Sequence, residues 1–314
     1  MTVPATLRLP APDAITLEDI IRIYEALRPQ MPAMPQPQVP PRRIDRLVDL
    51  LDHVEALLLD GFGVINIGAS RIDGILEFLD EVARRDIAVM VLTNGAGQPA
   101  ETSWQKYRNW GLALAREQVV SSRNSLEAEI AALTRGAVVG SMGPAARPLD
   151  IDGSLGFDDP DMFERATFLA FLGAIDWTEP HQAALEAALV GGQRQLLVAN
   201  PDISAPMQGG FTAEPGYWAA RAAQATGVRP HWFGKPHSAV FDLALARLET
   251  VYGRRFSRDK VAMVGDSLHT DILGGAAAGL QSVLLTGYGL FSNGGADDMI
   301  QACGITPHWI VERL

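Results

Sequence analysis

The chain has 314 residues, of which 47% are hydrophobic and 20% are charged, and its formal net charge at pH 7 is −11. This composition is typical of a soluble globular protein, and the length suffices for two domains. The negative charge argues against nucleic acid or an anionic membrane as a partner, and a single cysteine, Cys303, excludes an internal disulfide and a cysteine-based metal site.

The N-terminal segment shows neither the apolar core of a signal peptide nor an apolar run of membrane-spanning length, so we expect a cytoplasmic protein. Thr16 and the acidic residues that follow it predict a helix that runs to about Leu27. The prolines of residues 28–41 exclude regular helix and central strand, which predicts an extended linker. A second helix is predicted over residues 43–53.

Four short apolar runs that end in Gly, Asp, Asn or Thr predict strands buried on both faces of a parallel sheet. They span residues 56–59, 88–92, 261–264 and 282–285. Helical stretches are predicted between them, over residues 72–85 and over residues 239–251 with Ser238 as a cap. This alternation indicates an α/β fold.

Residues 136–231 repeat the α/β rhythm on a smaller scale. Strands are predicted at 137–139, 167–172 and 196–199, and Thr178 is expected to cap a helix that runs to Val190. We therefore predict a smaller α/β domain inserted into the first. The expected division is an N-terminal helix and proline-rich linker (1–42), a core domain (43–135 and 232–314) and an inserted domain (136–231).

Polar residues follow three of the predicted core strands. Asp60 ends the first run, Thr93 and Asn94 end the second, and Asp266 ends the third. Ligands of open α/β sheets bind outside the carboxyl ends of the strands, so we expect these residues to converge on one crevice.

Asp60 and Asp266 would repel each other at one sheet edge unless a proton or a cation lay between them. A hard cation with oxygen ligands, Mg²⁺ by preference, resolves this, and Asp271 is close enough in sequence to support it.

The remaining groups suit an anionic substrate. Thr93 supplies a hydroxyl, the backbone amides of Asn94 and Gly95 supply N–H donors for phosphate oxygens, and Lys235 supplies positive charge. Together with an aspartate nucleophile, they indicate phosphoryl transfer through an aspartyl-phosphate.

The sequences LLLDGFGV, LTNGAG, FGKPH and GDSLHTDI, in this order, resemble the four motifs of the haloacid dehalogenase superfamily. The insertion lies between the second and third motifs and carries Asn200-Pro201-Asp202 and Glu214-Pro215-Gly216, which is similar to the class IIA phosphatases. The resemblance covers about residues 50–314. It implies a doubly wound, Rossmann-like parallel-sheet core with an inserted α/β cap domain.

The resemblance also implies roles for the motif residues. Asp60 would be the nucleophile, and Thr93 and Lys235 would hold the transferring phosphoryl group. The Mg²⁺ ion would be bound by Asp60, Asp266 and the backbone carbonyl of Phe62, with support from Asp271. In the family, loops of the cap select the substrate, so Asn200 and Asp202 are candidate substrate-binding residues; equally, Asn-Pro-Asp is a turn that fixes the geometry of the cap.

Phe62 departs from the family pattern. The phosphatases carry Asp-x-Asp, and the missing second aspartate is the general acid and base, a function typically worth ~10²–10⁴ in rate. An aromatic at this place resembles the dehalogenases, and phosphonate-cleaving members also lack the second aspartate. His237 and His269 are candidate replacement acids, and their alternative is an ordinary polar role in a loop.

We therefore expect a Mg²⁺-dependent hydrolase that acts inefficiently on a small phosphorylated metabolite, without nucleic acid or membrane as a partner. The alternatives are hydrolysis of a C–P or C–halogen bond, and a non-catalytic protein that binds a phosphorylated metabolite or a partner. A homodimer through the cap would fit the family.

Overall fold

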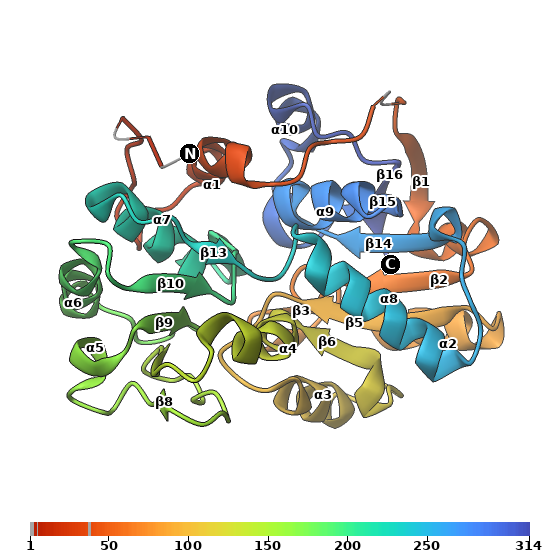
Figure 1. The fold of residues 1–314 in the computed structure, drawn as a ribbon. Helices are drawn as coiled ribbons and strands as arrows, with labels where there is room; N and C mark the ends of the chain where they lie inside the picture. Colours follow the sequence, from red (N-terminus) through yellow and green to blue (C-terminus); the bar gives the residue numbers. More distant parts are fainter. Residues whose placement is uncertain (1–2, 5, 37–38) are drawn as a thin grey trace.

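Two parallel sheets lie side by side in the computed structural model, which describes residues 3–4, 6–36 and 39–314 (Figure 1). The larger, seven-stranded sheet has the order β1-β16-β15-β14-β2-β5-β6. Its strands are β1 (Arg42–Arg46), β2 (Ala56–Leu59), β5 (Ala88–Thr93), β6 (Val119–Ser121), β14 (Val261–Gly265), β15 (Gln281–Leu285) and β16 (Trp309–Arg313).

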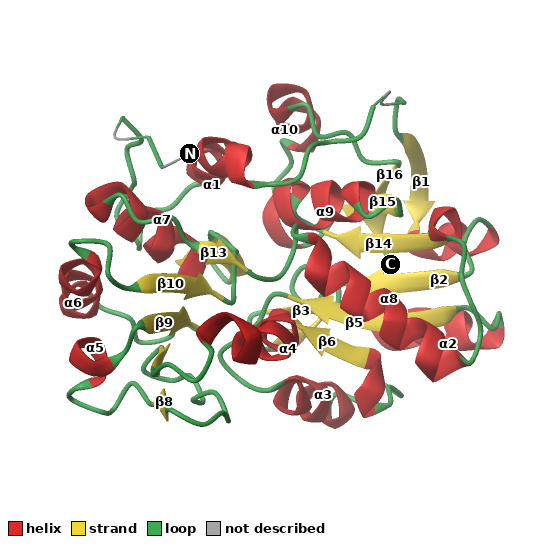
Figure 2. Ribbon diagram, viewed as in Figure 1, coloured by secondary structure: helices red, strands yellow, loops and turns green. Residues whose placement is uncertain are grey.

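Helices cover both faces of the larger sheet (Figure 2). The helices of this part are α2 (Ile75–Arg84), α3 (Ala100–Asn109), α8 (Ser238–Tyr252), α9 (Leu273–Ala277) and α10 (Ala296–Cys303). Leu57 and Leu59 of β2 pack with Phe78 of α2, whereas Leu58 packs with Phe241 of α8 on the opposite face. Because alternate residues of β2 are buried on opposite faces of the sheet, every residue of the strand is apolar. Helices on both faces make the core doubly wound.

The second sheet has five strands in the order β13-β10-β9-β7-β8. Its strands are β7 (Val139–Met142), β8 (Ser154–Leu155), β9 (Phe168–Phe171), β10 (Gln195–Val198) and β13 (His231–Trp232). The helices around it are α4 (Ser122–Thr134), α5 (Met162–Arg165), α6 (Glu179–Leu189) and α7 (Pro215–Thr226). Two short hairpins complete the strands, β3 (Asn66–Ile67) with β4 (Ser70–Arg71) and β11 (Ser204–Met207) with β12 (Gly210–Ala213).

The four predicted core strands are confirmed as β2, β5, β14 and β15, which are neighbours in the larger sheet. The predicted α/β architecture with a large parallel sheet and a second α/β unit is confirmed as well.

Three local predictions were wrong. Residues 43–53 do not form an α-helix, because β1 pairs with β16 at the sheet edge and Leu47–Asp52 then forms a 3₁₀ helix. Ser238 does not cap α8; it is the first helical residue, and His237 precedes it. The strand expected at 137–139 lies at Val139–Met142, where Gly140 sits against Met162 so closely that a Cβ atom would approach its Cγ to 2.8 Å.

The N-terminal helix α1 (Leu17–Leu27) is confirmed, with Thr16 as its N-cap. A one-turn 3₁₀ helix, Arg28–Gln30, follows it, and residues 31–36 and 39–41 of the predicted linker form neither helix nor strand. Residues 37 and 38 of that linker lie outside the described residues, as do residues 1, 2 and 5 of the N-terminal segment.

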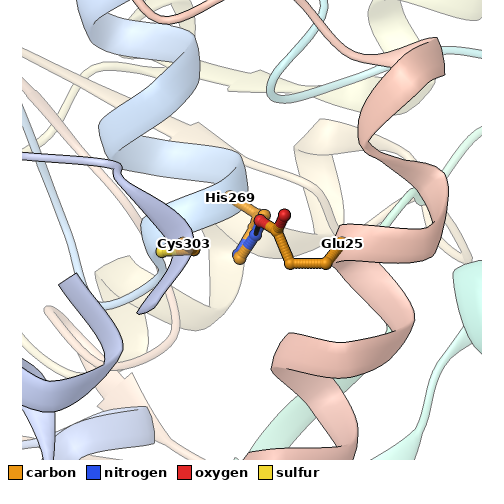
Figure 3. Close-up of side chains that lie close together, drawn as sticks. All are labelled: Glu25, His269 and Cys303. Atoms are coloured by element: carbon orange, nitrogen blue, oxygen red, sulfur yellow. Dashed lines mark hydrogen bonds and ion pairs between the residues drawn. The ribbon is translucent and has the colours of Figure 1, made fainter. Parts of the chain in front are cut away.

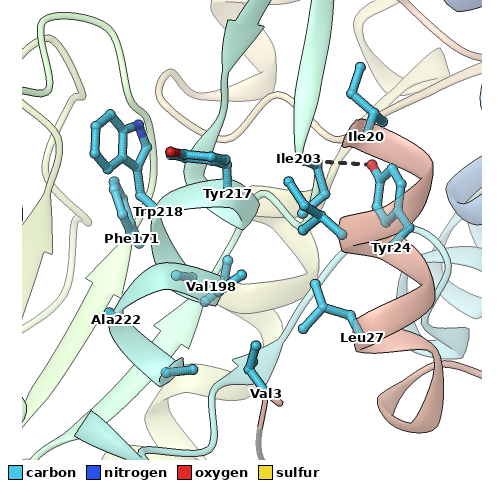
Figure 4. Packing of buried hydrophobic residues seen from close by; sticks show 14 of the residues in the cluster. Val3, Ile20, Tyr24, Leu27, Phe171, Val198, Ile203, Tyr217, Trp218 and Ala222 are labelled. Atoms are coloured by element: carbon cyan, nitrogen blue, oxygen red, sulfur yellow. Dashed lines mark hydrogen bonds between the residues drawn. The ribbon is translucent and has the colours of Figure 1, made fainter. Parts of the chain in front are cut away.

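Helix α1 packs against α7 beside the second sheet (Figure 4). Ile20, Tyr24 and Leu27 share one buried cluster with Tyr217 and Trp218 of α7. In addition, the Tyr24 hydroxyl accepts a hydrogen bond from the backbone N–H of Ile203 at 3.1 Å.

On its other side, α1 contacts the part of the chain that holds the larger sheet. Glu25 Oε1 lies 2.7 Å from His269 Nε2, and Cys303 of α10 lies next to this pair (Figure 3). The ring of Tyr24 stacks on His269 with centroids 4.9 Å apart. The N-terminal segment therefore joins the parts of the chain that hold the two sheets. Within the described residues, no helix is both long and apolar enough to span a bilayer.

We predict that Ile23→Ala lowers the free energy of unfolding by about 2–5 kcal/mol, because Ile23 is fully buried where α1 meets the common core. Guanidinium unfolding followed by circular dichroism measures this. The exposed Glu18→Gln variant on the same helix is the control and should change stability by less than about 0.5 kcal/mol. Equal stability of the two variants would mean that α1 is not part of the cooperative fold.

Candidate active site

The carboxyl ends of three neighbouring strands of the larger sheet form the candidate site. Asp60 follows β2, Thr93 is the last residue of β5, and Asp266 follows β14 on the other side of β2. All three side chains are buried and line one cavity of about 290 Å³. The structure thus brings these three predicted site residues together.

Lys235 lies beneath this cavity between two carboxylates. Its ammonium is 2.7 Å from Asp60 Oδ1 and 2.7 Å from Asp271 Oδ1, and its side chain is 1% exposed. The other oxygen of Asp271 accepts a hydrogen bond from the backbone N–H of Ser267 at 3.1 Å. Asp271 therefore holds both Lys235 and the loop that carries Asp266.

Asn94 fixes the backbone of Lys235. Its Oδ1 accepts from the Lys235 N–H at 2.8 Å, and its Nδ2 donates to the Lys235 carbonyl at 3.1 Å. Since the Asn94 side chain is occupied in this way, only its backbone could serve a ligand. Thr93 and Gly95 do face the cavity, and the Gly95 N–H points to Thr93 Oγ1 at 3.3 Å.

Asp60, Asp266 and Asp271 offer carboxylate oxygens that lie within 4.8 Å of one another. Asp266 Oδ2 accepts from the backbone N–H of Leu290 at 2.9 Å, and its other oxygen has no hydrogen bond from a described residue. Two glycines make room for it: a Cβ atom on Gly63 or on Gly289 would approach Asp266 Oδ2 to 2.4 Å or 1.8 Å. This buried set of hard oxygen donors fits a Mg²⁺ ion.

The electrostatics of the cluster support this fit. Burial raises the pKa of Asp60 to about 7, although Lys235 counteracts the effect, and burial together with Asp271 and Asp60 raises the pKa of Asp266 well above its usual range. Burial opposes the charge of Lys235, but the surrounding carboxylates outweigh it and raise the pKa of the ammonium. The cluster therefore lacks positive charge, which a divalent cation would supply.

The loop after β10 reaches the same cavity. Asn200 Oδ1 accepts from the backbone N–H of Asp202 at 2.9 Å, so this loop is a turn, and both side chains line the cavity. Asp202 Oδ1 also accepts from Asn94 Nδ2 at 2.8 Å, which connects the second sheet to the second motif. Burial raises the pKa of Asp202 to about 8.

Phe62 also lines the cavity, but neither candidate replacement acid does. His269 is fully buried against Tyr24 and Glu25, and burial lowers the pKa of His237 to about 4. Both histidines therefore occupy ordinary packing positions in the described structure.

The sequence analysis gave no site role to three ionisable residues that line the cavity: Tyr24, Lys106 and Glu214. Tyr24 belongs to the N-terminal segment, outside the family resemblance, and no motif marks Lys106. Glu214 was visible as part of the Glu-Pro-Gly signature, and the structure connects it to Asn200 by a hydrogen bond of 3.3 Å.

A second cluster, formed by Glu25, His269 and Cys303, has ligand-type atoms within 4.8 Å of one another. His269 Nε2 meets Glu25 and the Cys303 thiol donates to the Met299 carbonyl at 2.9 Å, whereas His269 Nδ1 is buried without a hydrogen-bond partner among the described residues. Arg28 adds a positive charge 3.7 Å from Glu25 Oε1. Through the Glu25–His269 contact and the stacking of Tyr24 on His269, this cluster connects α1 to the segment after β14.

Two sequence models of one superfamily match the chain. The model described as haloacid dehalogenase-like hydrolase matches residues 57–147, which contain Asp60 and Thr93. The model described as HAD-hydrolase-like matches residues 232–314, which contain Lys235, Asp266 and Asp271. Both matches begin after α1.

Curated relatives carry the name acid sugar phosphatase. The protein from Staphylococcus haemolyticus is 26% identical over 234 residues, which are 74% of this chain and 85% of the relative. The protein from Staphylococcus aureus is 26% identical over 235 residues, which are 74% and 86% of the two chains.

Solved structures share the fold. A possible sugar phosphatase of the haloacid dehalogenase superfamily from Cytophaga hutchinsonii superposes with a TM-score of 0.73 at 25% identity and covers 86% of this chain and 97% of its own. A haloacid dehalogenase-like hydrolase from Brucella suis gives a TM-score of 0.70 at 21% identity, covering 85% and 98%.

We predict that Asp202→Asn makes stability less dependent on pH in the presence of chelator. An unfolded aspartate ionises near pH 3.9, whereas Asp202 stays protonated in the folded protein up to about pH 8, so unfolding releases a proton and stability falls as pH rises through this window. The loss between pH 5 and 8.5 should be smaller in the variant by about 1–3 kcal/mol.

Thermal unfolding across this pH range measures the difference. Asp152→Asn, at an exposed aspartate of the same part of the chain, is the matched control and should follow the wild type. If Asp202→Asn also follows the wild type, the carboxyl at position 202 is ionised in the folded protein.

Proposed function

Because this chain belongs to the haloacid dehalogenase superfamily, we propose that it is a Mg²⁺-dependent phosphatase of small phosphorylated metabolites, with sugar phosphates as the first substrates to test. The observation that carries the proposal is the meeting of Asp60, Thr93 and Asp266 at one small cavity, with the Lys235 ammonium 2.7 Å from Asp60 Oδ1. A cavity of about 290 Å³ suits a small ester rather than a polymer.

In the proposed reaction, a carboxylate oxygen of Asp60 attacks phosphorus, and the electron pair of the breaking P–O bond goes to the leaving oxygen. Lys235, held by Asp271, neutralises the negative charge that gathers around the phosphoryl group. The Thr93 hydroxyl and the Gly95 N–H donate to its oxygens. The leaving oxygen takes a proton from solvent; water then attacks phosphorus of the aspartyl-phosphate and gives up a proton to solvent, the bond between phosphorus and the Asp60 oxygen breaks, and phosphate is released.

Asp60, Asp266 and the carbonyl of Phe62 are the proposed Mg²⁺ ligands. When bound, the ion would offset the repulsion among the carboxylates and the incoming phosphate. The carboxylate oxygens of Asp60 and Asp266 lie close together, as two ligands of one ion must. Both oxygens of Asp271 already have partners, Lys235 and Ser267, which favours an indirect role for Asp271 over direct binding of the ion.

We also infer that turnover is slow, because the phenyl ring of Phe62 can neither protonate the leaving oxygen nor activate water. The division into residues 1–42, 43–135 with 232–314, and 136–231 belongs to the proposal, as do a cytoplasmic location and a homodimer through the inserted domain.

The first test is phosphate release from a panel of sugar phosphates and an aryl phosphate, with Mg²⁺ and with chelator. We expect turnover that chelator abolishes and that Asp60→Asn lowers by at least about 10³-fold, because the variant lacks the nucleophile. Calorimetry should show weaker Mg²⁺ binding by Asp266→Asn than by the wild type. Turnover equal to that of Asp60→Asn would overturn the phosphatase proposal for these substrates, and phosphonates and haloacids would be tested next.

A second prediction concerns position 62. Phe62→Asp restores a carboxyl group two residues after the nucleophile, so we expect phosphatase turnover to rise by about 10-fold or more. Phe62→Asn is the matched control, since it changes size and polarity equally but has no acid, and it should show no gain. If the folded Asp variant is no faster than the Asn variant, Phe62 does not merely mark a lost acid.

A further inference from the structure

Lys106 of α3 is a cavity residue with no role in the proposed reaction. Among the described residues that line the cavity, it is the sole lysine or arginine. Its ammonium lies over the rings of Phe62, Tyr107 and Trp110, at 5.5, 5.0 and 5.1 Å from their centroids. The three rings hold the charge at the side of the cavity where Phe62 lies.

The charge of Lys106 is not neutralised. Aromatic rings attract a cation but carry no net charge. No carboxylate of the described residues lies within 4.0 Å of the ammonium, and the acceptor it has, Asn66 Oδ1, is 3.5 Å away, which is long for a hydrogen bond. Burial lowers the pKa of Lys106, in keeping with a cation that is partly withdrawn from water without a counter-ion. In a chain of net charge −11, such an arrangement calls for an anionic partner.

The phosphoryl group does not need this cation. Lys235 already provides the positive charge next to Asp60, at 2.7 Å. In an in-line displacement, the leaving group lies on the side of phosphorus opposite the attacking Asp60 oxygen. The rest of the substrate must therefore extend along the other cavity walls, which include Phe62, Lys106, Gln98 and Ser103.

We propose that Lys106 binds a second anionic group of the substrate, a carboxylate or another phosphate, so that the protein prefers phosphate esters with two separate negative groups. This inference rests on the proposed phosphatase function and specifies its substrate class. Ser103, three residues before Lys106 on α3, also lines the cavity and is a neutral donor that would complete the binding of such a group.

The test uses substrates that differ in the second charge. 3-Phosphoglycerate and glycerol 3-phosphate differ in a carboxylate, and fructose 1,6-bisphosphate and fructose 6-phosphate differ in a phosphate. We expect the wild-type protein to show at least about 10-fold higher kcat/KM for the member with the second negative group in one of the two pairs. The pair that shows this preference identifies the group that Lys106 binds. Lys106→Met, an unbranched side chain that is one atom shorter and uncharged, should raise KM for that member by about 10–100-fold and change KM for the member with a single phosphate by less than about 3-fold. Lys106→Arg should keep the preference.

A loss that is equal for both members of each pair would overturn the proposal, because it is the result expected if Lys106 only supports the aromatic rings. Absence of any preference in the wild type would overturn it as well.

A separate binding measurement keeps this outcome distinct from failure of the phosphatase proposal. In Asp60→Asn protein with Mg²⁺, calorimetry should show tighter binding of the member with the second negative group. Adding Lys106→Met should abolish the difference in affinity between the two members. Equal binding of both members before that change would contradict the proposal even if no substrate is turned over.

Discussion

The site depends on one buried ammonium, that of Lys235, held at 2.7 Å from both Asp60 and Asp271. Removing one partner of such a buried group typically costs about 3–5 kcal/mol, because it leaves an uncompensated charge. The ammonium connects three segments that are distant in sequence, and Asn94 adds a fourth by holding the Lys235 backbone. The position of Asp60, the proposed nucleophile, therefore depends on satisfying this single charge.

The roof of the cavity comes from two other parts of the chain. The turn at Asn200 and Asp202 reaches down from the second sheet and hydrogen-bonds to the second motif. Tyr24 enters from α1, stacks on His269 of the fourth motif and accepts from Ile203. Helix α1 thus packs on both halves of the protein. Part of the cavity lining therefore comes from a segment outside the residues that the superfamily models match.

Phe62 changes the chemical character of the cavity as well as removing an acid. Its ring lies under the Lys106 ammonium, which it helps to hold. The family's phosphatases have a carboxylate at this position, whereas here the position has an aromatic ring with a positive charge next to it. The aromatic residue and the unneutralised cation thus form one arrangement that favours binding of an anion over proton transfer.

The sequence by itself determined the parallel sheet and its reactive edge. Each buried strand is a short apolar run whose end is marked by a polar residue, as at Asp60 and Asp266, and this local signal survives folding because both faces of the strand are covered. Tertiary structure decided the rest. Residues 42–46, where a helix was expected from residue 43, form a strand because β16 offers hydrogen-bond partners, which no local propensity encodes. Tyr24 and Lys106 reached the cavity only through the packing of α1 and α3, since contacts between distant segments leave no periodic pattern in either one.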